Sequence, residues 1–423
     1  MRKSAVNIFV TITVCTSQAY SLTLLEAIKA SLQGNKKMVA NTLRLEAAEE
    51  NTKAARLNWV PTVSLSANTS VMQRDQGQSL KSHGTGVTTS ISLYDGGARK
   101  QNLIATESEF KAANERFNSV SYTGGNTRAS IAGDVLEAYI TILTLLEGKN
   151  QIQFNDATLN LFLSATTVET EQVMIQQQLT GLKKQAVNLD FQLRRVKEQF
   201  KNAASIELPP YDQLQSFDLA IASLEIPSNA DEAFRIALEK NPSIRVAEQD
   251  VITSEARNKA LRAGQGPQIS ANASVNRNSG LYNSGTVKNI GVTLSMNLDV
   301  KSGHYRSASD KFLAAAISDR DGIIDDRKFM IYDIYPSLEN QLETFNLDIE
   351  AQNAAKLKLQ TVIEKIKSGK PVNMMDEALF SLGTYNQYQQ TTSQSRTHIL
   401  NTKYRIQQTV GTFFEKLGIQ AKP

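Results

Sequence analysis

Proline, cysteine and histidine are all scarce in this sequence, and each scarcity narrows what the chain can be. Among 423 residues there are nine prolines, one cysteine and three histidines. Proline breaks helices, so the proline-free tract between Pro61 and Pro209 permits unusually long ones. The single cysteine, Cys15, excludes a disulfide framework and a cysteine-based metal site. The histidines lie far apart and lack the spacing of a zinc site, so the sequence predicts no enzyme, no metal and no cofactor.

A strong net charge and long apolar runs are also missing. Lys and Arg number 46 against 42 Asp and Glu, which leaves a formal charge of +4. There is no dense basic run, so a nucleic-acid partner is not expected. The mean hydropathy of −0.31 excludes a bundle of membrane helices, because each such helix needs about 20 apolar residues.

The N-terminus has the three parts of an export signal. Two basic residues precede a short apolar run at 5–14, and small residues stand before a cleavage point at Ala19. We therefore expect a signal peptide over residues 1–19 and an exported mature chain without cysteine. A lipid anchor on Cys15 is the alternative, although the residues before this cysteine match that motif poorly.

One long pattern occurs twice. The segment 22–99 recurs around 230–306 with an offset of 206, which drops to 205 after the first strand. We therefore expect a signal peptide (1–19), a first repeat (20–205), a linker (206–227), a second repeat (228–418) and a short tail (419–423). The identities that carry the match are Glu26-Ala27 with Glu232-Ala233, Asn35 with Asn241, Glu49 with Glu255, Lys53 with Lys259, Arg56 with Arg262, and Pro61 with Pro267.

Each repeat contains two stretches with strand periodicity. We expect strands at 62–73, 85–95, 268–278 and 289–299, with polar connections at 74–84 and 280–288. Along each strand apolar residues alternate with Ser, Thr and Asn, which predicts a sheet with one apolar and one polar face. The expected strands are long enough to span a bilayer. The alternative is a soluble sheet whose apolar face packs on a core.

The remaining tracts predict long coiled-coil helices. From Leu161 to Phe200 an alternating spacing of four and three residues is apolar at all but one position, which favours a coiled coil. The C-terminal tract 376–417 shares this spacing, although its middle, from Tyr385 to Arg396, is mostly polar. Pro336 interrupts a tract otherwise expected to be helical, so we expect a kink or break there.

The order of these features resembles the TolC family of outer-membrane channel proteins. The resemblance covers nearly the whole mature chain. It is carried by the opening helix at Leu24-Leu25-Glu26-Ala27 with Asn35 and its copy at Glu232-Ala233 and Asn241-Pro242, by the step Leu57-Asn58-Trp59-Val60-Pro61, and by Ser92-Leu93-Tyr94-Asp95-Gly96-Gly97-Ala98-Arg99.

The resemblance implies a mainly α-helical fold with a β-barrel part. Each of three identical chains would give four transmembrane strands to a twelve-stranded barrel in the outer membrane of a Gram-negative bacterium. Long helical hairpins would continue the barrel as an α-helical tube across the periplasm, with the linker 206–227 at its equator. The barrel lumen would then be lined by Ser64, Ser66, Thr88, Ser90, Ser270, Asn272, Thr293 and Ser295.

The resemblance also implies a periplasmic mouth at two helix–helix turns. In the second repeat the candidate residues are Gly369 in the turn, Asn373, and the acidic Asp376, one residue further along than the family pattern. In the first repeat Ala165 stands at the glycine position and Glu171 at the acidic one. Three copies of Asp376 would form a carboxylate ring; the alternative is an Asp that stabilises the start of its helix. Glu171 is similarly explained as a solvated flank of the coiled coil.

This family works as the exit duct of tripartite efflux or type I secretion systems. The implied partners are a periplasmic adaptor, an inner-membrane transporter of the RND or ABC type, two further copies of the chain, and outer-membrane lipid. The alternative function is a periplasmic coiled-coil adaptor or scaffold without a membrane barrel, and a carboxylate-type enzyme comes third.

Overall fold

The computed structural model describes residues 22–34, 36–73, 79–118, 127–211, 214–280, 284–296 and 301–416. The predicted signal peptide and Cys15 lie outside these residues. The chain forms two compact units, each assembled from separate stretches of sequence. The first unit contains residues 1–34, 132–224 and 341–400, and the second contains 35–131, 225–340 and 401–423.

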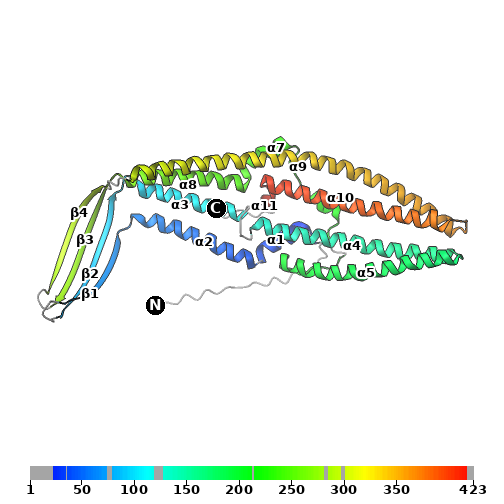
Figure 1. Cartoon of the computed structure of the whole chain (residues 1–423), viewed down its shortest axis with the longest axis horizontal. Helices are drawn as coiled ribbons and strands as arrows, with labels where there is room; N and C mark the ends of the chain where they lie inside the picture. The colour runs from blue at the N-terminus through cyan, green and yellow to red at the C-terminus, as the bar shows by residue number, and fades with distance from the viewer. Residues whose placement is uncertain are drawn as a thin grey trace. The chain divides into compact units, whose positions relative to one another are not determined.

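Long helices and four strands make up the described chain (Figure 1). The first half contains α1 Leu24–Gly34, α2 Lys36–Arg56, the short 3₁₀ turn η1 Leu57–Trp59, β1 Thr62–Gln73, β2 Ser79–Tyr94, α3 Ala98–Asn118, α4 Arg128–Ala165, α5 Glu169–Ala204 and α6 Phe217–Ser223. The second half contains α7 Ala230–Lys240, α8 Pro242–Gly264, β3 Pro267–Gly280, β4 Gly285–Met296, α9 Ser302–Lys367, the π-helical turn η3 Met374–Leu379, α10 Phe380–Val410 and α11 Phe413–Lys416.

The first unit has a core between four helices. Apolar side chains from α4, α5, α9 and the η3–α10 segment form one buried cluster, so the two helical hairpins pack on each other. Phe162 and Ile175 are fully buried, and Leu159 is almost so. The members of the cluster are Leu159, Phe162, Ile175, Leu179, Leu359, Val362, Met374, Ala378 and Leu382.

The apolar spacing from Leu161 to Phe200 runs through two helices. Helix α4 ends at Ala165 and α5 begins at Glu169, so the chain reverses at Thr166–Val168. The apolar spacing continues across the turn because both helices place their apolar positions against the same core. A heptad spacing alone therefore does not show where the chain reverses. The turn lies at the position to which the comparison of the repeats points, next to Ala165.

A buried tyrosine ties the start of the described chain to the segment after α5. The Tyr139 hydroxyl donates to the Leu22 carbonyl at 2.8 Å and accepts from the Gln215 backbone N–H at 3.1 Å. The Gln215 side chain in turn accepts from the Leu24 backbone N–H at 3.2 Å. Burial raises the pKa of Tyr139 to about 12, so its hydroxyl stays protonated and keeps both bonds at neutral pH.

In the second unit the four strands form one antiparallel sheet in the order β1-β2-β3-β4. The predicted connections at 74–84 and 280–288 are too long, since β2 already begins at Ser79 and β4 at Gly285. Serine and glycine residues that read as loop, such as Ser82 and Gly84, instead continue the polar face of β2.

The turn that connects β2 to α3 has the sequence Asp95-Gly96-Gly97-Ala98-Arg99, and its geometry accounts for these residues. Gly96 and Gly97 have φ angles of 65° and 91°, which favour residues without a Cβ. The Asp95 carboxylate accepts from the backbone N–H groups of Gly97 and Arg99, both at 3.0 Å, and pairs with the Arg99 side chain at 2.8 Å. The carboxylate therefore caps the start of α3.

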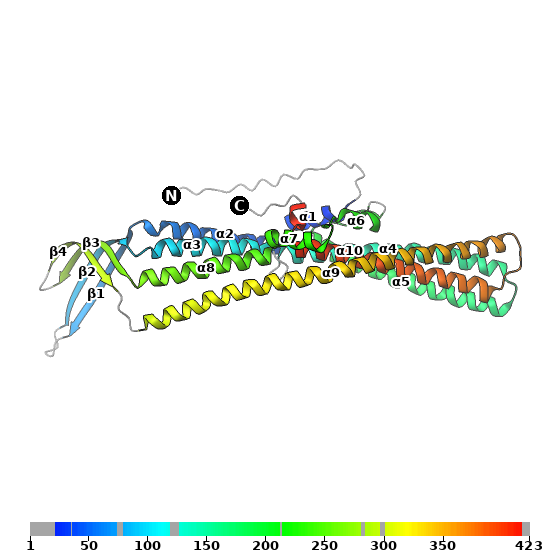
Figure 2. The ribbon, with the colours of Figure 1, turned by 90° about the horizontal axis from the view of Figure 1, so that it is seen from above.

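Helices α3 and α8 run side by side in both views of the second unit (Figures 1 and 2). Ion pairs cross between them, including Arg116 with Asp250 at 2.8 Å and Arg245 with Glu115 at 3.0 Å. Burial raises the pKa of Glu115, and the facing Arg245 opposes that rise.

Helix α9 stays helical through Pro336, so of the kink or break expected there the break does not occur. Proline lacks an N–H and costs the helix one hydrogen bond. Packing compensates here, because Ile334, Tyr335 and Leu338 are each at most 6% exposed. The Tyr335 hydroxyl also donates to the Pro227 carbonyl at 3.0 Å. Tertiary contacts therefore decide the outcome at this proline.

Candidate conduit surfaces

One face of the sheet is polar on all four strands. Directly paired residues of an antiparallel sheet point to the same side, so the pairing places side chains without ambiguity. Ser64 pairs with Thr88, Ser90 with Asn272, and Ser270 with Thr293. The eight residues predicted to line a lumen therefore share one face: Ser64, Ser66, Thr88, Ser90, Ser270, Asn272, Thr293 and Ser295.

Glycines on this polar face make room for asparagine side chains of the neighbouring strands. A Cβ placed on Gly84 would collide with Asn68 of β1 and lie 3.0 Å from Oδ1 of Asn278 on β3. Gly86 is likewise covered by Asn276. Short hydroxyl and amide side chains thus cover this face. Asp and Glu are absent from all four strands, and Arg277 and Lys288 alternate onto the other side.

The opposite face is apolar and exposed. Leu65 is 81% exposed and Ile290 is 91% exposed, and nothing in the described chain covers them. The same face carries Val63, Val87, Ala271, Ala273, Val275, Val292 and Leu294. Because large exposed apolar patches mark surfaces that meet a membrane or a partner, this face needs a covering that the chain does not supply.

The turn after α9 is built around Gly369 and Asn373. Gly369 has a φ of 69°, and the Lys370 N–H donates back to the Lys365 carbonyl at 3.0 Å, which closes the end of α9. Asn373 caps the next helix, because its side chain accepts from the Asp376 backbone N–H at 3.0 Å. Its amide also donates to the Asp376 carboxylate at 2.8 Å.

Asp376 therefore lies in the first turn of its helix, in the structural role that the sequence offered as the alternative to a carboxylate ring. A negative charge at a helix start is favourable, typically by about 0.3–1 kcal/mol. This structural role is compatible with a carboxylate ring, because the same side chain can stabilise the helix start and face a pore.

The first-repeat turn after α4 uses different chemistry. Thr166 Oγ1 donates to the Glu171 carboxylate and accepts from the Val168 N–H at 3.3 Å. Gln172 Nε2 donates to the Thr166 carbonyl at 3.0 Å. Glu171 is thus held inside its own turn, near the position expected of a mouth residue.

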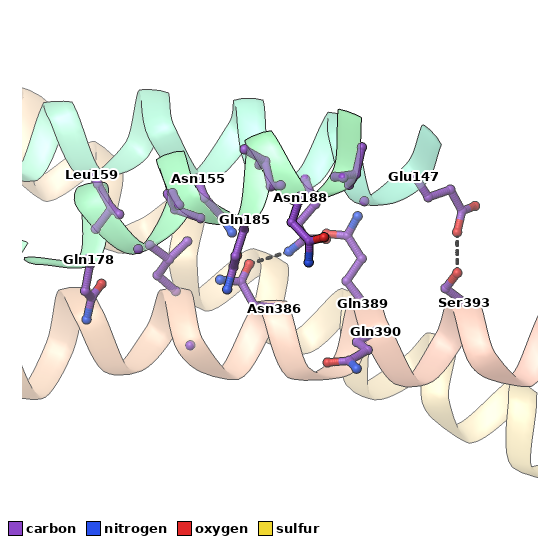
Figure 3. Close-up of a pocket in the computed structure, with 18 of the residues that line it drawn as sticks. Glu147, Asn155, Leu159, Gln178, Gln185, Asn188, Asn386, Gln389, Gln390 and Ser393 are labelled. Carbon is purple, nitrogen blue, oxygen red and sulfur yellow. Dashed lines mark hydrogen bonds between the residues drawn. The ribbon is translucent and has the colours of Figure 1, made fainter. Parts of the chain in front are cut away.

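A groove that the sequence did not predict runs between α4, α5 and α10 in the first unit (Figure 3). It encloses about 760 Å³, and its side chains include a single charged one, Glu147. Ten amides line it: Gln151, Asn155, Gln178, Gln185, Asn188, Gln192, Asn386, Gln389, Gln390 and Gln394. The sequence feature that corresponds to this groove is the mostly polar middle of the C-terminal tract, which lies on α10 and forms one wall of the groove.

The groove is partly cross-linked by its own side chains. Gln151 Nε2 donates to Asn386 Oδ1, and Ser393 Oγ donates to Glu147 at 2.6 Å. Asn155 is only 6% exposed, and its Oδ1 has no hydrogen-bond partner among the described residues. Amides both donate and accept, so this surface can solvate neutral polar groups and does not select by charge.

The described residues contain no group of three or more His, Cys, Asp or Glu side chains that could hold a metal ion. One helix in the same residues, α4, is long and apolar enough to cross a membrane, but 56% of that apolar window is buried in the structure. Burial of this kind is typical of a core helix.

Comparison with known proteins gives one family match. Residues 27–160, from α1 into α4, match the family described as outer membrane efflux protein. No curated protein sequence matches the chain significantly. Several solved structures share the fold over nearly its full length.

Three of these structures are outer-membrane proteins. VceC of Vibrio cholerae has a TM-score of 0.72 at 13% identity, over 92% of this chain and 96% of its own. CmeC of Campylobacter jejuni has a TM-score of 0.67 at 12% identity, over 92% and 85%. MtrE of Neisseria gonorrhoeae has a TM-score of 0.65 at 14% identity, over 97% and 95%.

The chain has the fold of the outer-membrane efflux channels. The resemblance to the TolC family that the sequence predicts is thereby confirmed. The matched family and the similar structures belong to the outer membrane, which is the location predicted for this chain. The matched family is also one of efflux proteins rather than enzymes.

Proposed function

We propose that the chain is one third of a homotrimeric exit duct in the outer membrane. It would pass substrates from a periplasmic adaptor and an inner-membrane transporter to the exterior, in a tripartite efflux or type I secretion system. The sheet carries this proposal, because its apolar face is exposed, its opposite face is polar, and β1 and β4 each have an outer edge without a partner among the described strands.

A four-stranded sheet with free edges cannot persist in lipid. Every backbone N–H and C=O there must be bonded within protein, which for strands requires a closed barrel. Three copies would close one by pairing β1 of each chain with β4 of the next. The polar faces would then surround the water-filled lumen, and the apolar faces would meet lipid.

Fractionation of cells and heat-modifiable migration on gels test the proposal. We expect the protein in the outer-membrane fraction, as an oligomer of three chains, with a band that shifts on boiling. A soluble periplasmic monomer would overturn the duct and favour the alternative of a coiled-coil scaffold. That alternative leaves the exposed apolar face of the sheet unexplained.

The mouth residues are the finer part of the proposal. The turns at Gly369 and at Thr166–Val168 end the two helical hairpins of the first unit, and we place the periplasmic mouth there, with Asp376 as its cation-attracting ring. In planar bilayers, Asp376→Ala and Asp376→Asn should both raise conductance or weaken cation preference, whereas Glu171→Gln should change neither. Unchanged behaviour of both Asp376 variants would remove this carboxylate from the gate.

A further inference from the structure

The formal charges of the sheet are of one sign and lie near one end of it. Its four strands contain no Asp or Glu, and their Lys and Arg residues are Lys81, Arg277 and Lys288. Lys288 pairs with Val275, so it belongs to the apolar face. Arg277 pairs with Thr85 and lies two residues beyond Val275, on that same face.

These cations lie at the hairpin end of the strands. Lys81 is the third residue of β2, Lys288 is the fourth of β4, and Arg277 is the fourth from the end of β3. Arg277 and Lys288 are exposed, and neither forms an ion pair within the described residues. Arginines of the second unit's helices differ, since Arg257 pairs with Glu109 and Arg262 with Asp310.

The other end of the sheet carries aromatic side chains instead. Tyr94 closes β2 and Trp59 precedes β1, and each is 52% exposed. Aromatic side chains and exposed cations both occur where an apolar band meets lipid headgroups, so the two ends of the sheet fit the two boundaries of a bilayer. Lys and Arg can lay their methylene stems along the apolar band and reach the headgroup layer with the charge.

We propose that Arg277 and Lys288 bind the phosphates of anionic lipid headgroups that surround the barrel at its hairpin end. The proposal rests on the proposed function, because it requires the apolar face to meet lipid. Charge complementarity carries it: the cations are exposed, have no acidic neighbour on any strand, and lie where headgroups would begin. A protein partner would also have to cover the apolar band around all three chains.

Lipid retention by the detergent-solubilised trimer tests this inference. Native mass spectrometry would compare bisphosphorylated lipid A with its monophosphorylated form of identical acyl chains. The wild-type protein should retain the bisphosphorylated lipid better. The double variant Arg277→Gln/Lys288→Gln should bind it roughly tenfold more weakly and lose the preference. The double variant Arg277→Lys/Lys288→Arg should keep both.

A charge-matched control separates local binding from net charge. Lys183 and Lys184 on α5 are exposed, so Lys183→Gln/Lys184→Gln removes the same charge from a helix. Equal weakening by this control, or wild-type retention in Arg277→Gln/Lys288→Gln, would overturn the inference. Heat-modifiable migration of each variant distinguishes the two failures: an intact barrel with unchanged lipid retention refutes only the lipid site, whereas a wild-type chain that forms no barrel refutes the proposed function as well.

Discussion

The helical part of the first unit and the sheet of the second unit handle apolar residues in opposite ways. In the first, Phe162 and Ile175 are fully buried in a core that the chain supplies itself. In the second, Leu65 and Ile290 are more than 80% exposed. A region with its own core is stable in the chain alone, whereas the sheet depends on what surrounds it. Substitutions of the same chemistry should therefore act differently in the two regions.

The largest effect is expected in the helical core. Phe162→Ala removes a fully buried ring between the two hairpins and should lower the free energy of unfolding by about 3–5 kcal/mol. Phe191→Ala on α5 is the control, because this ring is 60% exposed and its loss should cost less than about 0.5 kcal/mol. Denaturant unfolding of the helices in detergent, followed by circular dichroism, measures both. Equal losses in the two variants would contradict a self-contained core.

In the sheet the decisive variable is the face and not burial. Val292 and Thr293 are neighbours on β4 that point to opposite sides. Val292→Lys should destabilise the barrel in a bilayer by about 2–4 kcal/mol, because it puts a charge against lipid, while Thr293→Lys should be tolerated in a wet lumen. Urea titrations of the heat-modifiable band in lipid vesicles compare them. If Thr293→Lys destabilised the barrel more than Val292→Lys, the lipid-facing and lumen-facing sides would be the reverse of those proposed.

The same contrast explains what the sequence could predict. A period of two residues reports directly on which side a strand residue faces, so the eight polar residues from Ser64 to Ser295 fell on one face. The chain reversal at Thr166–Val168 leaves no trace in the heptad spacing, because both helices serve one core. Pro336 predicts a helix break because the hydrogen bond it removes is evident from the local sequence. The tertiary packing that offsets this loss is not evident from the local sequence. The amide groove joins α4 and α5 to α10, which begins more than 170 residues after α5 ends, and no local pattern reports that pairing.

A smaller effect should come from the hydrogen bonds of Tyr139. Tyr139→Phe keeps the buried ring but leaves the Leu22 carbonyl and the Gln215 N–H without this partner. The unfolding free energy should fall by about 1–3 kcal/mol. Tyr305→Phe is the control, because Tyr305 is 51% exposed. A loss near zero for Tyr139→Phe would show that the core of the first unit does not depend on these bonds.

The smallest expected effect lies where β2 joins α3, and it depends on pH. Burial alone would raise the pKa of Asp95, but hydrogen bonds from the Arg99 backbone and side chain and from Gly97 outweigh it and lower the pKa below its ordinary value of 3.8. A lowered pKa in the folded state means that the carboxylate stabilises the fold above its ordinary value and loses this contribution as pH falls through the folded-state value. Asp95→Asn should therefore be less stable than wild type at neutral pH, and the difference should shrink in acid. Unfolding titrations between neutral and acidic pH measure the difference. A difference that stays constant with pH would mean that Asp95 acts through shape alone, and that the join between helix and sheet is fixed by Gly96 and Gly97 rather than by charge.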